Sequence, residues 1–514
     1  MNRGDQRMNR DQRGAPPHVD RANDKPQMRA ARPVLVGVAA SLLWLAGAGE
    51  ARADTFGLFG AGARGTAMGG AMTAETDDFA SLYYNLAAMT ETDATVGFGL
   101  MGAWDRVRIR LKERPGGYDL PSPPEGTALS SAPRIPTSFR LRERADTEDV
   151  LDSYGFLVGA IGSFGIDRLR IGVLAYLPLN RIGLQRTHYA DEREQYFTNR
   201  LHFELLGTTT QSQTIIVGGA WRVTDWLSLG LGLSFLPGNS GTNLVYLDNP
   251  TDQSQIDIAL DNEQKGKVTP HAGLLLKPME SIKIGASWRG ELWFPLNLQN
   301  EVQVRTFQGD DEIFPVVQDL SGAVNYTPHQ ISVGASWERD RLTLSADLQV
   351  ALWSRYVNNQ GERVDQFEDT ASWRGGGEYR LTDWAFLRLG ASWEPSPVPP
   401  QTGRTNYVDN DRARFSLGTG HPFKLFGEDV TASWAFQLQH LIALDTNKAP
   451  LDSYPACEEG EARLCDEIPD DTTDPETGDP VPEYQGLQTG NPGFPGFGSS
   501  GQLYSLSVDI QWAF

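Results

Sequence analysis

The sequence predicts an all-β fold, a 14-stranded antiparallel transmembrane β-barrel with an N-terminal hatch inside its lumen. Three observations lead to this prediction. Residues 504–514 alternate strictly between apolar and small or polar side chains, short turns alternate with long polar connections, and a glycine-rich segment precedes the first strand. Strict alternation places one set of side chains on each face of a strand. An apolar outer face on a strand that ends the chain fits the lipid of an outer membrane.

Residues 1–53 have the pattern of a cleaved export signal with an N-terminal extension. Two arginines precede an apolar run over residues 34–48, and the tripeptide 51–53 (Ala-Arg-Ala) is a small-x-small cleavage site. The run is too short to span a bilayer, so we expect the mature protein to begin at Asp54. The polar residues before Met28 add nothing to a signal, which leaves two candidate start codons, the first residue and Met28.

Composition narrows the class of protein. The chain contains 54 Gly, 10% aromatic residues and two Cys, which fits an exported β-barrel better than a disulfide-stapled secreted domain. Its net charge of −21 argues against nucleic acid as a partner. Outside the signal, no apolar run reaches the length of a membrane-spanning helix. A membrane crossing by this chain therefore requires a closed barrel, which satisfies every backbone group internally.

Residues 94–514 divide into strands at their turns. Segments such as 227–235, 282–288 and 342–352 alternate as cleanly as the C-terminal strand. Short turns lie around 167–168, 224–225, 278–281, 339–340, 382–383 and 427–429. Long polar connections cover roughly 111–150, 180–210, 237–267, 291–328, 355–371, 395–412 and 442–501. This pattern gives fourteen strands, with short turns and both termini in the periplasm.

Residues 54–93 are rich in glycine and alanine and lack the alternation of a strand. A segment of this length before a barrel can form a periplasmic tail or a plug inside the barrel. The small-residue run GARGTAMGGAM (62–72) is able to pack closely against other backbone. We therefore predict a plug, called the hatch.

Residues 59–89, FGAGARGTAMGGAMTAETDDFASLYYNLAAM, resemble the N-terminal hatch of the outer-membrane long-chain fatty-acid and aromatic-hydrocarbon transporters, the FadL/TodX-like family. Segments 341–356, 373–399 and 409–420 are similar to later landmarks of that family and follow in the same order. With the terminal strand, the resemblance covers nearly all of the predicted mature chain. The hatch-motif residues that it identifies are Gly65, Gly69, Gly70, Asp77, Asp78, Tyr83, Tyr84 and Asn85.

The resemblance implies uptake of hydrophobic small molecules across the outer membrane without an energy-coupling partner. A fatty acid, an alkane or a monoaromatic compound would enter from outside, bind in the lumen, shift the hatch and leave sideways through the barrel wall. We expect a monomer without cofactor or metal, surrounded by outer-membrane lipid and lipopolysaccharide. The strand that ends at Phe514 resembles the signal recognised by the barrel-assembly machinery.

One departure from the family concerns the turn after the aromatic pair of the hatch. The family usually has Asn-Pro-Ala there, whereas this chain has Asn85-Leu86-Ala87. Loss of the proline removes a fixed φ angle, so the hatch turn is expected to be less rigid.

The predicted third strand, 169–183, contains a candidate site for the lateral opening. Pro178 lacks the N–H needed for a ladder hydrogen bond, and such residues lie at strand edges or bulges. Pro178 with Gly183 is consistent with a kinked strand that leaves the wall partly unpaired. Alternatively, Pro178 simply ends the strand at the outer rim. The sequence favours neither reading.

Polar residues elsewhere suggest structure rather than catalysis. Seven histidines are scattered without metal-ligand spacing, and no nucleophile elbow is present, so we predict no enzyme activity. Asp77 and Asp78 are expected to pair with luminal Arg or Lys and hold the hatch closed, the alternative being a solvated turn or helix cap. Cys457 and Cys465 predict a local disulfide in the last long connection.

Two other functions stay open at this stage. A barrel with a glycine-rich lumen could serve as a general porin for polar solutes. The acidic connection over 442–501 could instead make the protein a surface adhesin or an assembly component.

Overall fold

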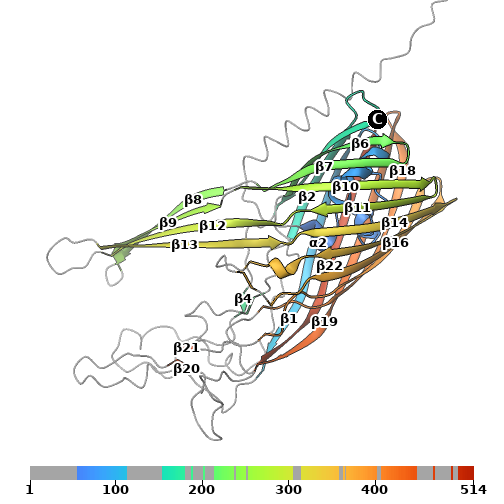
Figure 1. The fold of residues 1–514 in the computed structure, drawn as a ribbon. Coiled ribbons are helices and arrows are strands. Elements are labelled where there is room, and N and C mark those ends of the chain that lie inside the picture. Colours follow the sequence, from blue (N-terminus) through green and yellow to red (C-terminus); the bar gives the residue numbers. More distant parts are fainter. Residues whose placement is uncertain are drawn as a thin grey trace, which may run out of the picture.

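The computed structural model describes residues 55–112, 153–179, 187–188, 201–202, 214–236, 239–249, 253–264, 266–304, 314–357, 363–364, 366–401, 407–448, 467–468, 488–489 and 496–514. Within these residues, fourteen antiparallel strands form a closed barrel, as predicted (Figure 1). In order around the wall they are β1 (Thr95–Leu111), β2 (Ser153–Gly162), β3 (Leu169–Pro178), β6 (Thr214–Thr224), β7 (Leu227–Leu236), β10 (Lys267–Met279), β11 (Ile282–Arg289), β14 (Gln330–Arg339), β15 (Leu342–Ala351), β16 (Thr370–Thr382), β17 (Ala385–Glu394), β18 (Arg412–Leu425), β19 (Glu428–Asn447) and β22 (Gly496–Ala513).

The barrel closes between its first and last strands. β1 pairs with β22 from Thr95↔Ala513 to Leu111↔Phe497. Each of the predicted short turns joins two neighbouring strands, and the start of β1 and the end of β22 lie at the same end of the barrel as these turns. We call this the short-turn end.

The two faces of the wall differ as the alternation predicts. On β7, Leu229, Leu231 and Leu233 are exposed on the outside, and Leu231 reaches 72% relative exposure. Ser228 and Ser234, on the opposite face of the same strand, are buried. Apolar side chains exposed on the outside of the wall fit a wall that faces hydrocarbon.

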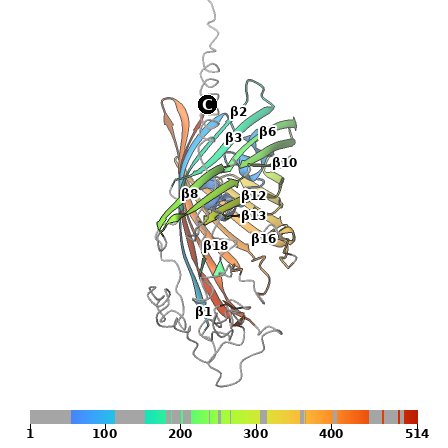
Figure 2. The same cartoon turned by 90° about the vertical axis from the view of Figure 1, so that its left-hand side faces the viewer.

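The connections expected over 237–267 and 291–328 contain strands, which corrects the prediction that they are merely polar loops. β8 (Asn239–Asn249), β9 (Gln253–Gln264), β12 (Leu292–Val304) and β13 (Phe314–Thr327) form a four-stranded sheet in the order β13-β12-β9-β8. The sheet projects beyond the barrel at the end opposite the short turns (Figures 1 and 2). The physical reason is continuity, because these strands extend the β7, β10, β11 and β14 segments of the wall. Two short pairs, β4 (Thr187–His188) with β5 (Leu201–His202) and β20 (Glu467–Ile468) with β21 (Gln488–Thr489), complete the described strands.

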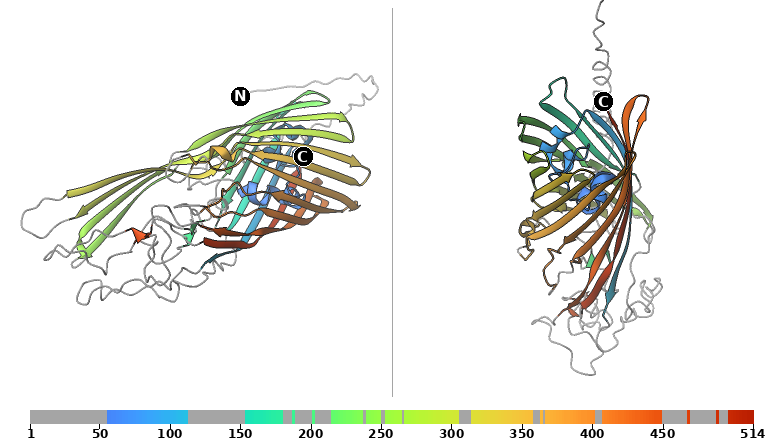
Figure 3. Two further views of the ribbon diagram at one scale, coloured as in Figure 1. Left: turned by 60° about the horizontal axis from the view of Figure 1, so that its bottom comes forward. Right: turned by 90° about the vertical axis from the view of Figure 1, so that its right-hand side faces the viewer.

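The segment before β1 lies inside the barrel (Figure 3). It comprises α2 (Thr55–Phe59), α3 (Gly62–Ala67), α4 (Ser81–Tyr84) and η2 (Leu86–Glu91). Its apolar side chains, among them Phe56, Met68, Phe79 and Leu82, form one buried cluster with side chains of the wall such as Tyr176 of β3. We call residues 55–93 the hatch. None of the helices in the described residues is long and apolar enough to span a membrane.

Candidate functional site

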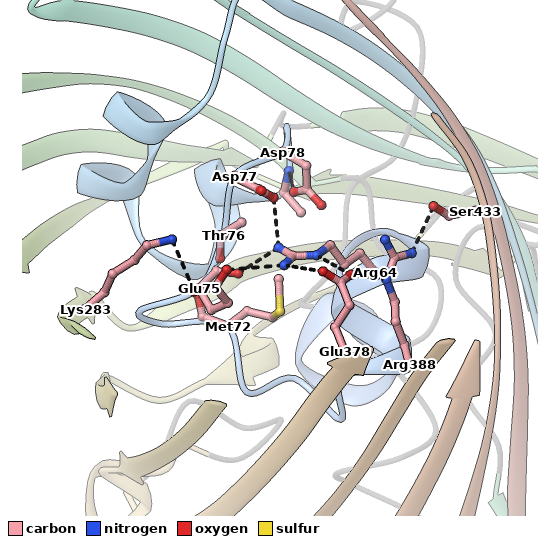
Figure 4. A network of polar contacts seen from close by, with 11 residues as sticks. Arg64, Met72, Glu75, Thr76, Asp77, Asp78, Lys283, Glu378, Arg388 and Ser433 are labelled. Carbon is pink, nitrogen blue, oxygen red and sulfur yellow. Dashed lines mark hydrogen bonds and ion pairs between the residues drawn. The ribbon is translucent and has the colours of Figure 1, made fainter. Parts of the chain in front are cut away.

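Arg64 of α3 lies at the centre of the contacts between the hatch and the wall (Figure 4). Its guanidinium group pairs with Asp77 at 2.9 Å, with Glu75 at 3.4 Å and with Glu378 of β16 at 3.2 Å. A fourth group, the carbonyl oxygen of Glu75, accepts a hydrogen bond from Nη1 at 2.8 Å. Arg64 thus links separate parts of the hatch to one another and connects the hatch to the barrel through Glu378.

Glu378 also belongs to a pair within the wall. Nε of Arg388 on β17 lies 2.5 Å from Oε2 of Glu378, and Nη1 of Arg388 donates to Oγ of Ser433 on β19 at 3.1 Å. Glu75 makes a second link, because Nζ of Lys283 on β11 lies 3.2 Å from its carboxylate. We call Arg64, Glu75, Asp77, Lys283, Glu378 and Arg388 the Arg64 network. It joins the hatch to two separate parts of the wall.

The charges of this network offset the cost of burying its hatch residues. Burial by itself raises the pKa of Glu75, but Arg64 and Lys283 outweigh it and hold that pKa below its usual value. Burial likewise tends to lower the pKa of Arg64, yet Asp77, Glu378 and Glu75 raise it well above the ordinary value. Both groups are therefore ionised at neutral pH, and removing one partner would leave a buried charge uncompensated.

The sequence predicts that Asp77 and Asp78 pair with luminal Arg or Lys, and the two side chains differ in their contacts. Asp77 pairs with Arg64, which is itself a hatch residue. Oδ1 of Asp78 accepts a hydrogen bond from the backbone N–H of Ala80 at 2.8 Å, an Asx turn just before α4. The ion pairs between this cluster and the wall are made by Arg64 and Glu75, whose side chains are buried deeper than that of Asp77.

Wall side chains also bind backbone groups of the hatch directly. Oδ2 of Asp509 on β22 accepts from the N–H of Ala63 at 2.5 Å, and Oδ2 of Asp347 on β15 accepts from the N–H of Thr73 at 2.8 Å. Nε2 of Gln439 on β19 donates to the carbonyl of hatch residue 58 at 2.7 Å. Irregular backbone buried in a lumen needs such partners, and the wall supplies them.

The hatch has a second charged contact near the short-turn end. Glu91, the last residue of η2, pairs with Lys277 of β10 at 2.5 Å and with Arg222 of β6 at 3.5 Å. Nε of Arg170 on β3 donates to the carbonyl of Thr92 at 2.9 Å. The hatch is therefore attached on opposite parts of the wall, by α3 in the middle of the lumen and by η2 towards the short-turn end.

The hatch-motif residues mainly set the internal fold of the hatch. Gly69 and Gly70 have φ of +65° and +78°, a region that side-chain-bearing residues rarely adopt. A Cβ on Gly65 would lie 2.5 Å from Oη of Tyr84, and that hydroxyl accepts from the N–H of Ala61 at 2.9 Å. The tight turn and the buried tyrosine thus fix α3 against α4.

Tyr83 and Asn85 extend these contacts to the wall. The guanidinium of Arg289 on β11 lies 3.8 Å from the centre of the Tyr83 ring, a cation–π contact. Nδ2 of Asn85 donates to the carbonyl of Thr73 at 2.7 Å and to that of Leu274 on β10 at 3.0 Å. Its Oδ1 accepts from the N–H of Ala87 and so caps η2.

Glycines on the wall allow the hatch to approach the strands closely. At each of these glycines, an added Cβ atom would lie so close to an atom of the hatch that the two would clash or nearly clash. The glycines are Gly97, Gly159, Gly172, Gly218, Gly230, Gly232, Gly273, Gly285, Gly334, Gly376, Gly390 and Gly418. Leu86, which replaces the family's proline, is buried above Gly218 and Gly232. Its side chain therefore anchors the turn by packing, where proline would have fixed it by geometry.

Pro178 is the last residue of β3 rather than a kink within it. Pairing of β3 with β2 runs unbroken to Gly155↔Pro178, and pairing with β6 runs unbroken to Tyr176↔Thr214. The described part of the strand thus matches the reading in which Pro178 ends it. Gly183, Cys457 and Cys465 lie outside the described residues, as does the predicted cleavage site after Ala53.

A recess of about 590 Å³, partly open to solvent, lies above the hatch on the side away from the short turns. Its lining combines Leu58 of the hatch with aromatic Tyr326 and Trp353 and with the charged pair Glu394 and Arg412. Next to it, a smaller recess of about 370 Å³ includes Tyr83 and His271.

An aromatic cluster adjoins the larger recess through Tyr326, which lines it. Tyr326, Tyr356, Phe367 and Tyr407 form a buried cluster, with the rings of Tyr356 and Phe367 stacked at 4.2 Å. The recess is thus bounded by Leu58 of the hatch on one side and by Tyr326 and Trp353 on another.

Comparison with known proteins places this geometry among related barrels. A family profile described as "Outer membrane protein transport protein (OMPP1/FadL/TodX)" matches residues 193–460. A solved FadL homologue of Pseudomonas aeruginosa is 17% identical, with a TM-score of 0.53 over 91% of this chain and 100% of that chain. The P. putida toluene transporter TodX is 13% identical, with a TM-score of 0.48 over 89% and 99% of the two chains. The Ralstonia pickettii toluene transporter TbuX is 14% identical, with a TM-score of 0.45 over 89% and 100%. No curated protein sequence compared with this chain matches it.

Proposed function

This chain belongs to the outer membrane protein transport family (OMPP1/FadL/TodX), and from that premise we propose that it carries hydrophobic compounds passively through the outer membrane. The proposed compounds are long-chain fatty acids, alkanes or monoaromatic hydrocarbons. In this proposal the short-turn end and both termini face the periplasm, and the protein acts as a monomer in contact with outer-membrane lipid and lipopolysaccharide.

The packing of the hatch supports this proposal more than any other observation. Hatch atoms lie against wall glycines, and the Arg64 network connects the hatch to β11 and β16. A polar solute would need a continuous water-filled path, which so closely packed a hatch obstructs. A transporter that opens when a ligand binds above the hatch is compatible with this arrangement.

The proposed binding place is the pair of recesses above the hatch. Leu58 and Tyr83 belong to the hatch and line the larger and the smaller recess respectively. A ligand that binds there touches the part of the molecule that must move. A ligand shifts the equilibrium between a closed and an open hatch only if it binds one of the two states more tightly than the other.

We propose that release is lateral, at the outer end of β3. Tyr176, the last residue of β3 that pairs with β6 in the described chain, packs against Phe56 of α2 with ring centres 5.6 Å apart. A shift of α2 would remove this support from the strand end. Lateral release also has a thermodynamic advantage, because exposing a hydrophobic ligand to water costs about 25 cal/mol per Å² of apolar surface.

A paired measurement of uptake and conductance tests the proposed function. The full-length protein is produced in Gram-negative cells that lack their own transporters, and uptake of labelled palmitate, an alkane and toluene is followed. The purified protein is also inserted into planar bilayers. We expect uptake of at least one of these compounds and little steady ion current.

Two outcomes would replace the proposal. A large steady current with no uptake would identify a porin for polar solutes. Loss of binding to cells or surfaces on deletion of 442–501, with no uptake by the intact protein, would identify an adhesin or assembly component.

A further inference from the structure

The hydrogen-bonded wall is interrupted between two neighbouring hairpins, at the end opposite the short turns. β10 pairs with β11 up to His271↔Arg289, and pairing resumes in the projecting sheet, between β9 and β12, at Gln264↔Leu296. Between these two pairs, residues 266–270 have no paired residue in β11 or β12 within the described chain. The same stretch of β10 stays paired with β7, and β12 stays paired with β13. We call this interruption, ~17 Å of strand, the β10–β12 window.

Pro270 accounts for the start of the window. Its carbonyl oxygen accepts the backbone N–H of Gly290 at 3.0 Å, so the polar backbone groups of this residue are directed towards β11 and β12. In an antiparallel ladder such a residue bonds to the same neighbour through both groups, and proline has no N–H to donate. The register is the same on both sides of the window, with an equal number of residues on each strand. The interruption therefore begins at a missing donor and contains no inserted residue.

The outer side of the window is apolar. Val268 is 50% exposed, and it lies opposite Phe235 of β7, which is exposed as well. The two residues continue the exposed face of β7 that includes Leu231 and Leu233. That face fits contact with hydrocarbon, and the projecting sheet begins just beyond the window. In the proposed orientation, the window thus lies at the outer surface of the membrane.

The inner side of the window leads to the smaller recess above the hatch. Thr269 of β10 and Leu292 of β12 border the window, and both line that recess together with Tyr83 of the hatch. The recess extends to Thr214 of β6, which lies opposite Tyr176 in the last described pair of β3 and β6. It therefore reaches from the window to the strand end where release is proposed.

A side-chain contact bridges the window where backbone hydrogen bonds would otherwise lie. Nζ of Lys267 on β10 is 3.8 Å from the centre of the Trp293 ring on β12, a cation–π contact. Both side chains are half-buried. Rotation about side-chain bonds is enough to break this contact, whereas a complete ladder would open only if two strands separated. The window is thus closed by side chains and can open without disrupting the barrel.

We propose that the β10–β12 window is a lateral entrance, through which hydrophobic compounds adsorbed at the outer surface of the membrane reach the smaller recess. The inference rests on the proposed function, because lateral release at β3 leaves the window as the way into the same recess. Apolar compounds leave water for an apolar surface before they meet the protein. An entrance beside that surface receives them without passage through water in the mouth of the barrel.

A chemical bridge across the window tests this proposal. In the full-length protein without its two native cysteines, Lys267→Cys and Trp293→Cys are joined by a bifunctional maleimide in intact outer membranes. Ala272→Cys with Trp288→Cys is the matched control, because these residues lie opposite each other just below the window, where the ladder is already closed. Uptake of labelled palmitate and toluene and the amount of each compound bound to the protein are both measured. Heat-modifiable migration on gels establishes that each variant is folded.

We expect the bridge across the window to lower both uptake and binding several-fold, and the control bridge to change neither. Normal uptake by the bridged window variant would overturn the proposal. Full binding without uptake would overturn it too, because the window would then be a way out. If the unmodified protein transports neither compound, the proposed function fails, whereas binding that the bridge blocks would still support the entrance and unchanged binding would refute it.

A second pair of variants tests the role of the missing donor. Pro270→Val restores an N–H on the side that faces β12, so the ladder can extend into the window, and uptake should fall several-fold. Pro422→Val is the control, because Pro422 lies in the β18–β19 ladder and does not line the recess. Equal uptake by the two variants would show that pairing at Pro270 does not control entry.

Discussion

Arg64 is the only charged residue between positions 55 and 74, in a run of small and apolar residues. A single charge in such a run is the sequence signal for a paired, buried role, although the adjacent acids Asp77 and Asp78 are the more conspicuous charges of the hatch. Its wall partner Glu378 was out of reach of sequence reasoning, since 314 positions separate the two residues. Only the barrel register brings them together.

The Arg64 network predicts different effects for its two carboxylate partners. We expect Glu378→Gln to weaken docking of the hatch by about 3–5 kcal/mol, because Arg64 and Arg388 would lose a buried counter-charge. Asp77→Asn is the matched control, since the Asp77 side chain is 54% exposed and water screens its pair to about 0–1 kcal/mol. Steady conductance in planar bilayers should rise for the first variant and stay low for the second. Equal conductance in both would refute a closing role for Glu378.

Asp78 predicts that docking of the hatch depends on pH. Burial raises the pKa of Asp78 to about 6, with Arg64 and Arg388 opposing the rise and Asp77 adding to it. The pKa is raised from 3.8 in the undocked hatch to about 6 in the docked hatch, so the docked state favours the protonated carboxyl. The stabilisation is complete below pH 3.8, and it is lost as the pH rises through about 6.

We therefore expect the hatch to be about 1–2 kcal/mol less stably docked at pH 7.5 than at pH 5. Hydrogen–deuterium exchange of the hatch, corrected for the intrinsic rate at each pH, measures this difference. Asp78→Asn retains an oxygen that can accept from the N–H of Ala80 but removes the titrating group, so the pH-dependent difference should vanish in this variant. An unchanged pH profile in that variant would show that another group is responsible.

The outer face of β7 predicts which substitutions block assembly. Leu231 is among the most exposed apolar residues described, so Leu231→Arg should destabilise the folded barrel by about 2–4 kcal/mol in a membrane. Leu231→Ala, at the same position, should assemble normally. Heat-modifiable migration of membrane fractions on gels measures folding. Normal migration of the arginine variant would mean that this face does not contact hydrocarbon.

At the scale of elements, alternation and turn chemistry were sufficient to predict the wall. Each of the six predicted short turns joins two barrel strands, because short turns are determined by local residues. The four-stranded sheet of β8, β9, β12 and β13 was not predicted. Its strands carry many polar residues, so they lack the clean pattern that one lipid-facing side imposes.

The end of β3 predicts where a covalent tether stops transport. Ala175 and Ile215 lie directly opposite each other on β3 and β6, next to the last pair of that ladder. A disulfide between cysteines at these positions should abolish uptake while ligand binding survives, because lateral release requires these strands to separate. Ile331 and Val350, opposite each other on β14 and β15, provide the control tether. Uptake is followed before and after reduction, with Cys457 and Cys465 replaced by serine.

Normal uptake by the β3–β6 tether would exclude release between these strands. Loss of uptake in both tethered variants would show that the barrel must deform as a whole. Neither result would affect the proposed binding place above the hatch.

At the scale of the whole molecule, the account depends on a hatch that fills the lumen and has to move. The sequence predicted the hatch from its glycine-rich composition and its resemblance to one family. It did not reveal that glycines around the wall receive the hatch, because each glycine also fits an ordinary small inward position of a strand. Their common role follows only from the closed barrel, in which twelve separated positions contact one segment.

A reversible tether between the hatch and the wall tests this central claim most directly. A Cβ on Gly376 of β16 would lie 3.0 Å from Cβ of Met68 and 2.5 Å from the carbonyl oxygen of Met68, so the two segments must move apart slightly to reach the Cβ separation of about 3.5–4.5 Å in a disulfide. In a protein with Cys457 and Cys465 replaced by serine, Met68→Cys and Gly376→Cys form the tether, and uptake of a labelled hydrophobic compound is measured. We predict no uptake when the tether is oxidised and recovery after reduction. Equal uptake in the two states would contradict a moving hatch.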